Sequence, residues 1–313
     1  MGQVKAICIS KKRGTQKQLV EKANFLPHFG IEGDAHGGNW HRQISLLSYE
    51  KVAEFKARGA DIFPGAFGEN MIVEGYDFRN LPVGTVFRCG QVVLRMTQIG
   101  KECHNHCQIY HKMGECIMPV EGVFAEVLCG GEIHVGDEMA MELPDPRRPY
   151  QAAVVTLSDK GFSGEREDKS GPVLTEMLQH AGYEVVETII LPDEQKKIET
   201  ELIRLSDGRQ VDLILTTGGT GFSERDCTPE ATMAAATKNA PGIAEAIRAY
   251  SMQYTKRAML SRGASVIRNQ TLIINLPGSP KAVKESMECI LDQLSHGLGI
   301  LTGREGECGR TNP

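Results

Sequence analysis

A glycine-rich turn at 218–221 gives the strongest chemical signal in the chain. The run 211–217 (VDLILTT) is continuously apolar, as are strands buried on both faces of a parallel sheet, and it leads straight into Gly218-Gly219-Thr220-Gly221. Glycines at such a position let a ligand approach the backbone, whose N–H groups can hold phosphate. Neither a Gly-Lys-Ser/Thr loop nor a complete dinucleotide fingerprint is present. The turn by itself therefore indicates either a phosphate site or only a tight bend.

An acidic residue, Asp226, lies between this turn and the next helix. We expect Thr228 to cap that helix and Pro229 to occupy its first position, where both residue types are favoured. Asp226 is then not needed as a cap, and its carboxylate is available for another role.

Polar residues also follow the other expected strands. Asp159 follows the first, and a loop ending in Asp168 and Ser170 comes after it; Asp193 follows the second strand, and 275–281 (NLPGSPK) follows the fourth. The carboxyl ends of parallel strands meet at one edge of a sheet, where ligands usually bind. Read alone, Asp193 and Ser170 are equally good as helix caps.

The elements that must position these residues alternate along the second half. Expected strands lie at 151–157, 184–191, 211–217 and 271–276, and expected helices at about 171–181, 194–208, 229–239, 241–254 and 281–298. This β-α succession predicts a three-layer α/β domain whose sheet is mostly parallel and covered by helices on both faces.

The first half has a different rhythm. Short β-like pieces separated by glycines, with one helix near 49–58, predict a β-barrel. The proline- and arginine-rich stretch 143–151 (LPDPRRPYQ) is typical of a linker between domains. We expect a barrel domain at 1–143, a linker at 144–150, an α/β domain at 151–303 and a tail at 304–313.

Cysteine and histidine gather in two places in the first half. Loop 30–50 contains Asp34, His36 and His41, and a later stretch holds Cys103, Cys107, Cys116, His104, His106 and His111. The second group could form a zinc site, although no CxxC spacing is present. The alternatives are a working thiol at Cys103 and buried, inert thiols at Cys116, Cys8, Cys89, Cys129 and Cys289.

Composition limits the class of protein. The chain has 313 residues, a formal net charge of -5 and a pI near 6.0, which argues against a nucleic-acid binder. No apolar run is long enough to cross a bilayer, and the N-terminus lacks the features of a signal peptide. We expect a cytoplasmic protein without membrane partners.

The second half resembles the molybdopterin adenylyltransferase family over nearly all of 151–301. The matching pieces are SDKGFSGEREDKSGP, LPDE, TTGGTGFSERDCTPEAT, AMLSR and NLPGSPKA, in family order. The resemblance implies transfer of AMP from ATP to the terminal phosphate of molybdopterin. It also implies trimers for this half.

Site residues follow from the same resemblance. The key acidic positions of the family fall on Asp193 and Asp226, where paired carboxylates could hold Mg²⁺ against ATP phosphates or orient the pterin phosphate. A family serine falls on Ser251. Arg262 and Lys281 are candidate cations or solvated charges. The expected ligand-binding positions are Asp159, Asp168, Ser170, Gly218, Gly219, Thr220, Gly221, Asn275, Pro277, Gly278 and Ser279.

The first half resembles the MOSC domain, named for the C-terminal part of molybdenum cofactor sulfurases. GIEGDAHGG, RQISLL, PGAFGEN and GEIHVGDEM carry this resemblance, over roughly 1–142. It implies a β-barrel and places the family's functional cysteine on Cys103. Many members have Pro immediately before this Cys, whereas this chain has Gly-Lys-Glu-Cys. Because of this departure, the resemblance alone does not imply the activity on N-hydroxylated bases that some members have.

Three functions remain open at this point. The chain is an adenylyltransferase acting on molybdopterin, or it carries the finished cofactor without adenylylation, or the front domain is the catalyst through Cys103. A molybdenum-inserting protein is the expected partner, and the choice between molybdenum and tungsten stays open.

Overall fold

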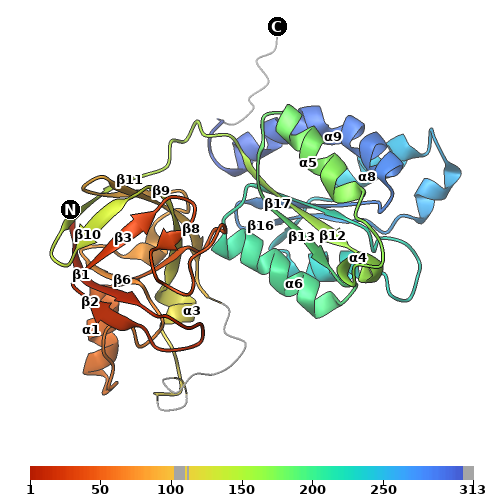
Figure 1. Cartoon of the computed structure of the whole chain (residues 1–313). Helices are drawn as coiled ribbons and strands as arrows, with labels where there is room; N and C mark the ends of the chain where they lie inside the picture. The colour runs from red at the N-terminus through yellow and green to blue at the C-terminus, as the bar shows by residue number, and fades with distance from the viewer. Residues whose placement is uncertain (102–109, 111–112, 306–313) are drawn as a thin grey trace, which may run out of the picture. The chain divides into compact units, whose positions relative to one another are not determined.

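The structure, a computed structural model, describes residues 1–101, 110 and 113–305. The chain divides into two compact units, Met1–Asp145 and Pro146–Pro313 (Figure 1), which are described separately. In the described part of the chain, no helix combines the length and the apolar character needed to cross a bilayer.

The first unit is built around a closed β-barrel. Its strands are β1 (Gly2–Ile9), β5 (Ile44–Ser48), β6 (Met71–Glu74), β7 (Val86–Cys89), β8 (Val92–Ile99), β9 (Val123–Cys129) and β11 (Glu138–Glu142). They pair in the order β11-β7-β8-β9-β5-β6-β1, and β1 then pairs with β11 to close the ring. All these pairings are antiparallel except β5 with β6. The expected β-barrel is thus confirmed.

Smaller elements cover the barrel. β2 (Gln18–Val20) adds to β1, and β10 (Gly131–His134), β3 (Lys22–Leu26) and β4 (Gly30–Ile31) form a three-stranded sheet. In the described ranges of this unit, the helices are α1 (Tyr49–Ala57) and the short η1 (Phe78–Asn80) and α3 (Met118–Glu121). Within the core, Phe78 and Phe87 stack edge to face with ring centroids 5.3 Å apart. Aromatic packing of this kind adds to the stabilisation that burial gives.

The second unit has a six-stranded sheet in the order β13-β12-β14-β17-β16-β15. The strands β12 (Gln151–Leu157), β13 (Glu184–Leu191), β14 (Leu213–Thr217) and β17 (Thr271–Leu276) are parallel, as expected. Two antiparallel strands, β16 (Ser265–Arg268) and β15 (Lys238–Asn239), were not expected. The second of these lies in a segment that we expected to be helical. Its two residues pair with β16, and this tertiary pairing outweighs local helix propensity.

Helices cover both faces of this sheet (Figure 1). Alternate β12 residues point to opposite sides: Ala152 and Val154 pack with α5 (Ser170–His180), α8 (Pro241–Ser251) and α9 (Pro280–Leu301), as the first core cluster of this unit shows. Ala153 and Val155 pack with α6 (Gln195–Ile203) and α7 (Thr228–Ala235). The remaining short helices are α4 (Asp159–Phe162), η2 (Arg204–Gly208) and η3 (Lys256–Leu260). Period-2 burial on both faces explains the continuous apolar runs in the sequence.

The segment that enters the second unit is anchored to it. Asp212, at 6% side-chain exposure, accepts hydrogen bonds from Arg148 Nη1 (2.9 Å) and from the backbone N–H of Gln151 (2.7 Å). From beyond α9, Arg304 donates to the carbonyl of Arg148 (2.9 Å) and stacks over the ring of Tyr150 at 4.5 Å. The expected linker residues 148–150 are therefore held by contacts to the second unit.

Candidate active site

The glycine turn follows β14 at the carboxyl edge of the parallel strands, where Figure 1 also shows α4. Gly218 and Gly219 have φ values of +106° and +63°, a region that side chains with a Cβ rarely adopt. A Cβ on Gly218 would lie 2.4 Å from the carbonyl oxygen of Leu157, and one on Gly219 would lie 2.2 Å from Thr228 Oγ1. Both conformation and space therefore require glycine here.

Thr228 holds the turn and does not cap the helix, which corrects our expectation. The N-cap of α7 is Cys227, and no side chain caps it. Thr228 is fully buried, and its Oγ1 donates to the carbonyl of Gly218 (3.0 Å) while its N–H donates to that of Gly219 (3.2 Å). These two bonds fix the conformation of the two glycines.

Asp193 is not a helix cap either, because Glu194 occupies the N-cap position of α6. Its Oδ2 accepts from the backbone N–H of Asp159 (3.2 Å), and Asp159 Oδ1 accepts from the N–H of Asp193 (3.0 Å). The other oxygen, Asp193 Oδ1, is buried and has no hydrogen-bond partner among the described residues. It lies 3.0 Å from the point that a Cβ on Gly219 would occupy. An unsatisfied carboxylate oxygen therefore faces the glycine turn.

Asp226 lies on the far arm of the same turn. Its Oδ2 accepts from the N–H of Ser223 (3.2 Å) and lies 2.8 Å from the Cβ position of Gly221. Burial raises the pKa of Asp193, and the charges of Asp159 and Asp226 raise it further. The two acids named by the sequence thus lie within electrostatic range of each other at one edge of the sheet.

Two arginines hold this loop. At its base, Arg262 donates from Nε to the carbonyl of Gly221 (2.6 Å), from Nη2 to that of Asp226 (2.6 Å), and from Nη1 to Glu230. Across the loop, Arg225 pairs with Asp159, and this pairing holds the pKa of Asp159 below its usual value. Arg262 therefore supports the loop backbone, whereas Lys281 is 87% exposed and lies against Glu285.

Several expected ligand-binding residues use their polar atoms within the fold. Asp168 lies one residue before the N-cap of α5, Lys169, and accepts from the first N–H groups of that helix, those of Ser170 (2.9 Å) and Gly171 (3.0 Å). Ser170 Oγ donates to the carbonyl of Gly278 (2.8 Å), and Ser279 Oγ accepts from the N–H of Ala282 (3.2 Å) to cap α9. These side chains shape the edge of the site by positioning backbone.

Asn275, which we expected among the ligand-binding residues, is buried and its amide makes hydrogen bonds within the fold. Its Nδ2 donates to Thr216 Oγ1 (2.9 Å) and Thr232 Oγ1 (2.8 Å), and its Oδ1 accepts from the N–H of Ala264 (3.1 Å). At 3% exposure the amide is committed to these partners. Asn275 is the penultimate residue of β17, and two threonines, Thr216 of β14 and Thr232 of α7, supply acceptors inside the fold.

Four other expected site residues are described by their contacts and positions. The Pro277 carbonyl accepts from Thr217 Oγ1 (2.7 Å), the Cβ position of Gly278 is 3.3 Å from Gly218 Cα, and the Thr220 carbonyl accepts from the N–H of Arg262 (2.9 Å). Ser251 is the last residue of α8. In the described contacts, no hydrogen bond joins its side chain to Asp193 or Asp226.

The first unit contains a buried polar cluster that the sequence indicated only in part. Lys17 Nζ contacts both oxygens of Asp34 at 2.6 Å, and both side chains are 1% exposed. Asp34 also accepts from the N–H of Ser10 (2.8 Å) and from Asn70 Nδ2 (3.2 Å). His36 Nδ1 lies 3.2 Å from Lys17 Nζ, whereas His41 pairs with Gln98 at 3.0 Å. Asp34 and His36 therefore share one cluster, and His41 has a different partner.

The structure describes only some of the cysteines and histidines that the sequence singled out. Cys103, Cys107, His104, His106 and His111 lie outside the described residues. Cys8 and Cys89 are buried, Cys116 and Cys289 are intermediate, and Cys129 is exposed, so our expectation of burial is wrong for Cys129. Within the described ranges, no group of three or more His, Cys, Asp or Glu could hold a metal ion.

Comparisons with known proteins identify the families that the chain matches. Residues 153–296 match the family described as a probable molybdopterin binding domain, and residues 32–140 match the MOSC domain. A molybdopterin adenylyltransferase of Escherichia coli is 46% identical over 142 residues, 44% of this chain and 72% of that protein. One from Helicobacter pylori is 38% identical over 161 residues, 51% of this chain and 92% of that protein.

The chain belongs to the molybdopterin adenylyltransferase family. A MOSC domain precedes the part that matches this family. Among solved structures, the molybdopterin biosynthesis enzyme MoaB from Thermus thermophilus is 44% identical, with a TM-score of 0.48, and the match covers 49% of this chain and 97% of that one. Family membership agrees with the resemblance that the strand-end motifs carried.

Sequence reasoning missed two charged residues. Arg225 adjoins Asp226 in the quoted motif, and its position in that motif was the available signal. Lys17 gave no signal, because a single lysine between two short strands normally reads as a solvated surface charge.

Proposed function

We propose that the second unit transfers AMP from ATP to the terminal phosphate of molybdopterin. The observation that carries this is the unsatisfied, buried Oδ1 of Asp193, which faces the glycine turn and lies within electrostatic range of Asp226. Relatives that carry the name molybdopterin adenylyltransferase support the choice of substrate.

The reaction requires no protein nucleophile. A phosphate oxygen of molybdopterin attacks the α-phosphorus of ATP and forms a new P–O bond. The bond between the α-phosphorus and the bridging oxygen breaks, and pyrophosphate leaves with that electron pair. The protein contributes position and charge neutralisation.

The donor set at this edge fits Mg²⁺. Magnesium is usually bound by one or two carboxylates together with substrate phosphates, and Asp193 and Asp226 offer such a pair. When bound, the ion would neutralise phosphate charge. The N–H groups of Gly219 and Gly221 would approach the phosphates, because neither residue has a Cβ to obstruct them.

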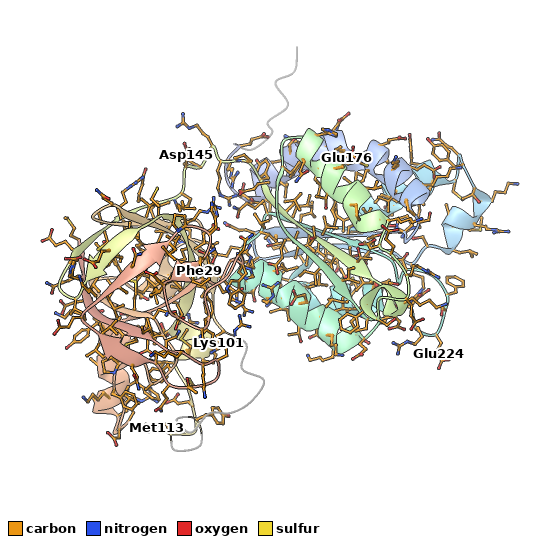
Figure 2. All side chains as sticks on the ribbon, viewed as in Figure 1. Phe29, Lys101, Met113, Asp145, Glu176 and Glu224 are labelled. Carbon is orange, nitrogen blue, oxygen red and sulfur yellow. The ribbon has the colours of Figure 1, made fainter. Side chains whose placement is uncertain are left out.

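The test of this proposal is direct. Purified protein given ATP, Mg²⁺ and molybdopterin should form adenylylated pterin and release one pyrophosphate per transfer, measured by mass spectrometry and a pyrophosphate assay. Asp226→Asn should lower the rate by about 10²-fold, because a carboxylate that neutralises phosphate charge is lost. Glu224→Gln, an exposed acid in the same loop that Figure 2 labels, is the matched control.

A carrier without enzymatic activity would behave differently. It would bind the pterin tightly and release no pyrophosphate, and that result would refute the proposed function. A normal rate in Asp226→Asn would refute the role of that residue alone.

For the first unit we propose that Cys103 handles sulfur or a metal–sulfur group. The supporting observation is Lys101, two residues before it. Lys101 carries a positive charge, and a cation close to a thiol favours the reactive thiolate form. Cys103→Ser should abolish sulfur transfer and leave AMP transfer intact; loss of both would contradict independent sites.

The proposal also extends to assembly and location. We place the reaction in the cytoplasm, with the second unit forming trimers and handing its product to a molybdenum-inserting protein. Light scattering of the purified chain tests the trimer, and a monomer at all concentrations would contradict it.

A further inference from the structure

Arg225 contacts both carboxylate oxygens of Asp159. Its Nε donates to Asp159 Oδ2 (3.0 Å), and its Nη2 donates to Oδ1 and Oδ2 (both 2.9 Å). The contact joins the loop after β14 to α4, two segments separated by 66 residues in sequence. The planar guanidinium presents its donors in a fixed fork that matches a carboxylate.

The contact continues from Asp159 to Asp193. The Oδ1 of Asp159 that accepts from Arg225 also accepts from the backbone N–H of Asp193 (3.0 Å). In return, the N–H of Asp159 donates to Asp193 Oδ2 (3.2 Å). An arginine on one loop thus restrains an acid on another, although the two side chains share no direct hydrogen bond in the described contacts.

The other key acid is restrained through the backbone. Asp226 directly follows Arg225 in sequence, so fixing the guanidinium on α4 fixes the far arm of the turn. Arg262 holds only the base of that arm, through the carbonyls of Gly221 and Asp226. Without Arg225, the described contacts leave residues 222–225 only local bonds to Asp226: the Ser223 N–H donates to its Oδ2 (3.2 Å), and the Ser223 carbonyl accepts from its N–H (3.0 Å).

We propose that Arg225 is a positioning residue for AMP transfer, which sets the separation of Asp193 and Asp226 by clamping the turn to Asp159. This inference rests on the proposed function of the same site. The alternative is an ordinary surface ion pair, since the two side chains are 59% and 44% exposed. Such pairs contribute little to stability, so the two ideas differ in what removal of the arginine does to the loop and to the rate.

The first experiment needs no ligand. Hydrogen exchange of the full chain is followed in peptides that cover 218–228 and 158–162, in the parent, Arg225→Gln and Arg225→Lys. Faster exchange of both segments in Arg225→Gln, at an unchanged melting temperature, is the expected result. Unchanged exchange in both segments overturns the inference, whether or not the chain transfers AMP.

The second experiment measures kinetics with ATP, Mg²⁺ and molybdopterin. Arg225→Gln should lower kcat by roughly tenfold to a hundredfold, as misplacement of about 1 Å does in other enzymes, with KM changing less than kcat. Arg225→Lys keeps the charge but not the fork, so it should recover only part of the rate. A kcat equal to that of the parent overturns the inference.

The matched control is Arg88→Gln. Arg88 is 56% exposed and lies 3.6 Å from Glu142 in the first unit, so it reproduces the exposure of the pair without the site. It should leave exchange in 218–228 and kcat unchanged. A parent that transfers no AMP refutes the proposed function, whereas an active parent with an equally active Arg225→Gln refutes only the inference drawn for Arg225.

Discussion

Each unit of the chain contains a carboxylate–cation pair, Lys17–Asp34 in the first and Arg225–Asp159 in the second. The two pairs differ in burial and in whether a carboxylate oxygen beside them lacks a hydrogen-bond partner in the described structure. In the first unit, Lys17 and Asp34 are 1% exposed, and Ser10 and Asn70 supply further donors to Asp34. In the second unit, Arg225 and Asp159 are half-exposed, and the neighbouring Asp193 keeps a buried oxygen without a partner in the described structure.

This difference fits a structural role for the first pair and the positioning role that we propose for the second. A buried charge needs every hydrogen bond that the fold can supply, and Asp34 has them; burial raises its pKa, but the bonds from Lys17, Ser10 and Asn70 outweigh this and lower it. An oxygen left unsatisfied beside a glycine turn costs stability, which is expected where a ligand or ion completes the site. Three variants test the comparison.

The largest effect should come from the buried pair. Lys17→Met leaves Asp34 charged and unpaired, so the free energy of unfolding of the first unit should fall by about 3–5 kcal/mol, measured by urea denaturation. Lys22→Met, whose lysine is 58% exposed and pairs with Glu132 at 2.9 Å, is the control and should change it little. A loss equal to that of the control would show that the pair is not structural.

The second variant is Asp193→Asn, which should lower kcat by roughly 10²- to 10³-fold, about 3–4 kcal/mol in the barrier. The pKa of Asp193 is raised by burial and by the charges of Asp159 and Asp226. A carboxyl whose folded-state pKa is raised costs stability once pH rises above its unfolded value, because the charged form is disfavoured in the fold. The variant should therefore melt no lower than the parent at pH 7, with the difference vanishing in acid.

Calorimetry at pH 7 and pH 3, together with rate measurement, checks this. The control is Asp292→Asn, an exposed acid on α9. A variant that is both inactive and much less stable would assign Asp193 a structural role, like that of Asp34.

The smallest effect should come from Gly219→Ala. The added methyl meets Thr228 Oγ1 and Asp193 Oδ1, and φ is +63°. We expect about 1–2 kcal/mol of backbone strain and a rate reduced about tenfold or more by displaced groups. Gly182→Ala, at φ +85° with open space around its Cβ, carries similar strain without the contacts. Equal rates in the two variants would remove the turn from the site.

Regular elements of the second unit could be predicted from the sequence, because the central parallel strands β12, β14 and β17 are buried and each is a mostly apolar run. The partly exposed strand β13 was recognised by its β-branched residues. The antiparallel strands β16 and β15 were not, since Lys238–Asn239 has no pattern of its own and becomes a strand by pairing with Ser265–Arg268. Local sequence does not encode a partner that lies elsewhere in the chain.

The site residues divide in a similar way. Glycine requirements and acids at strand ends could be predicted, because steric space and topology determine them. The uses of Thr228 and Asn275 could not, because each depends on an acceptor supplied by another segment: the carbonyl of Gly218, and the hydroxyls of Thr216 and Thr232. For the same reason the Arg225–Asp159 contact was not foreseen.

The anchoring of the entry segment determines where the chain can be cut to separate its two units. Asp212 receives hydrogen bonds from Arg148 and Gln151, while Arg304 contacts Arg148 and Tyr150 from beyond α9. A chain that began at Gln151, where β12 begins, would lack Arg148 and Tyr150. The buried carboxylate of Asp212 would then lose the hydrogen bond from Arg148. The two units are therefore best separated at the peptide bond between Asp145 and Pro146, several residues before β12 begins.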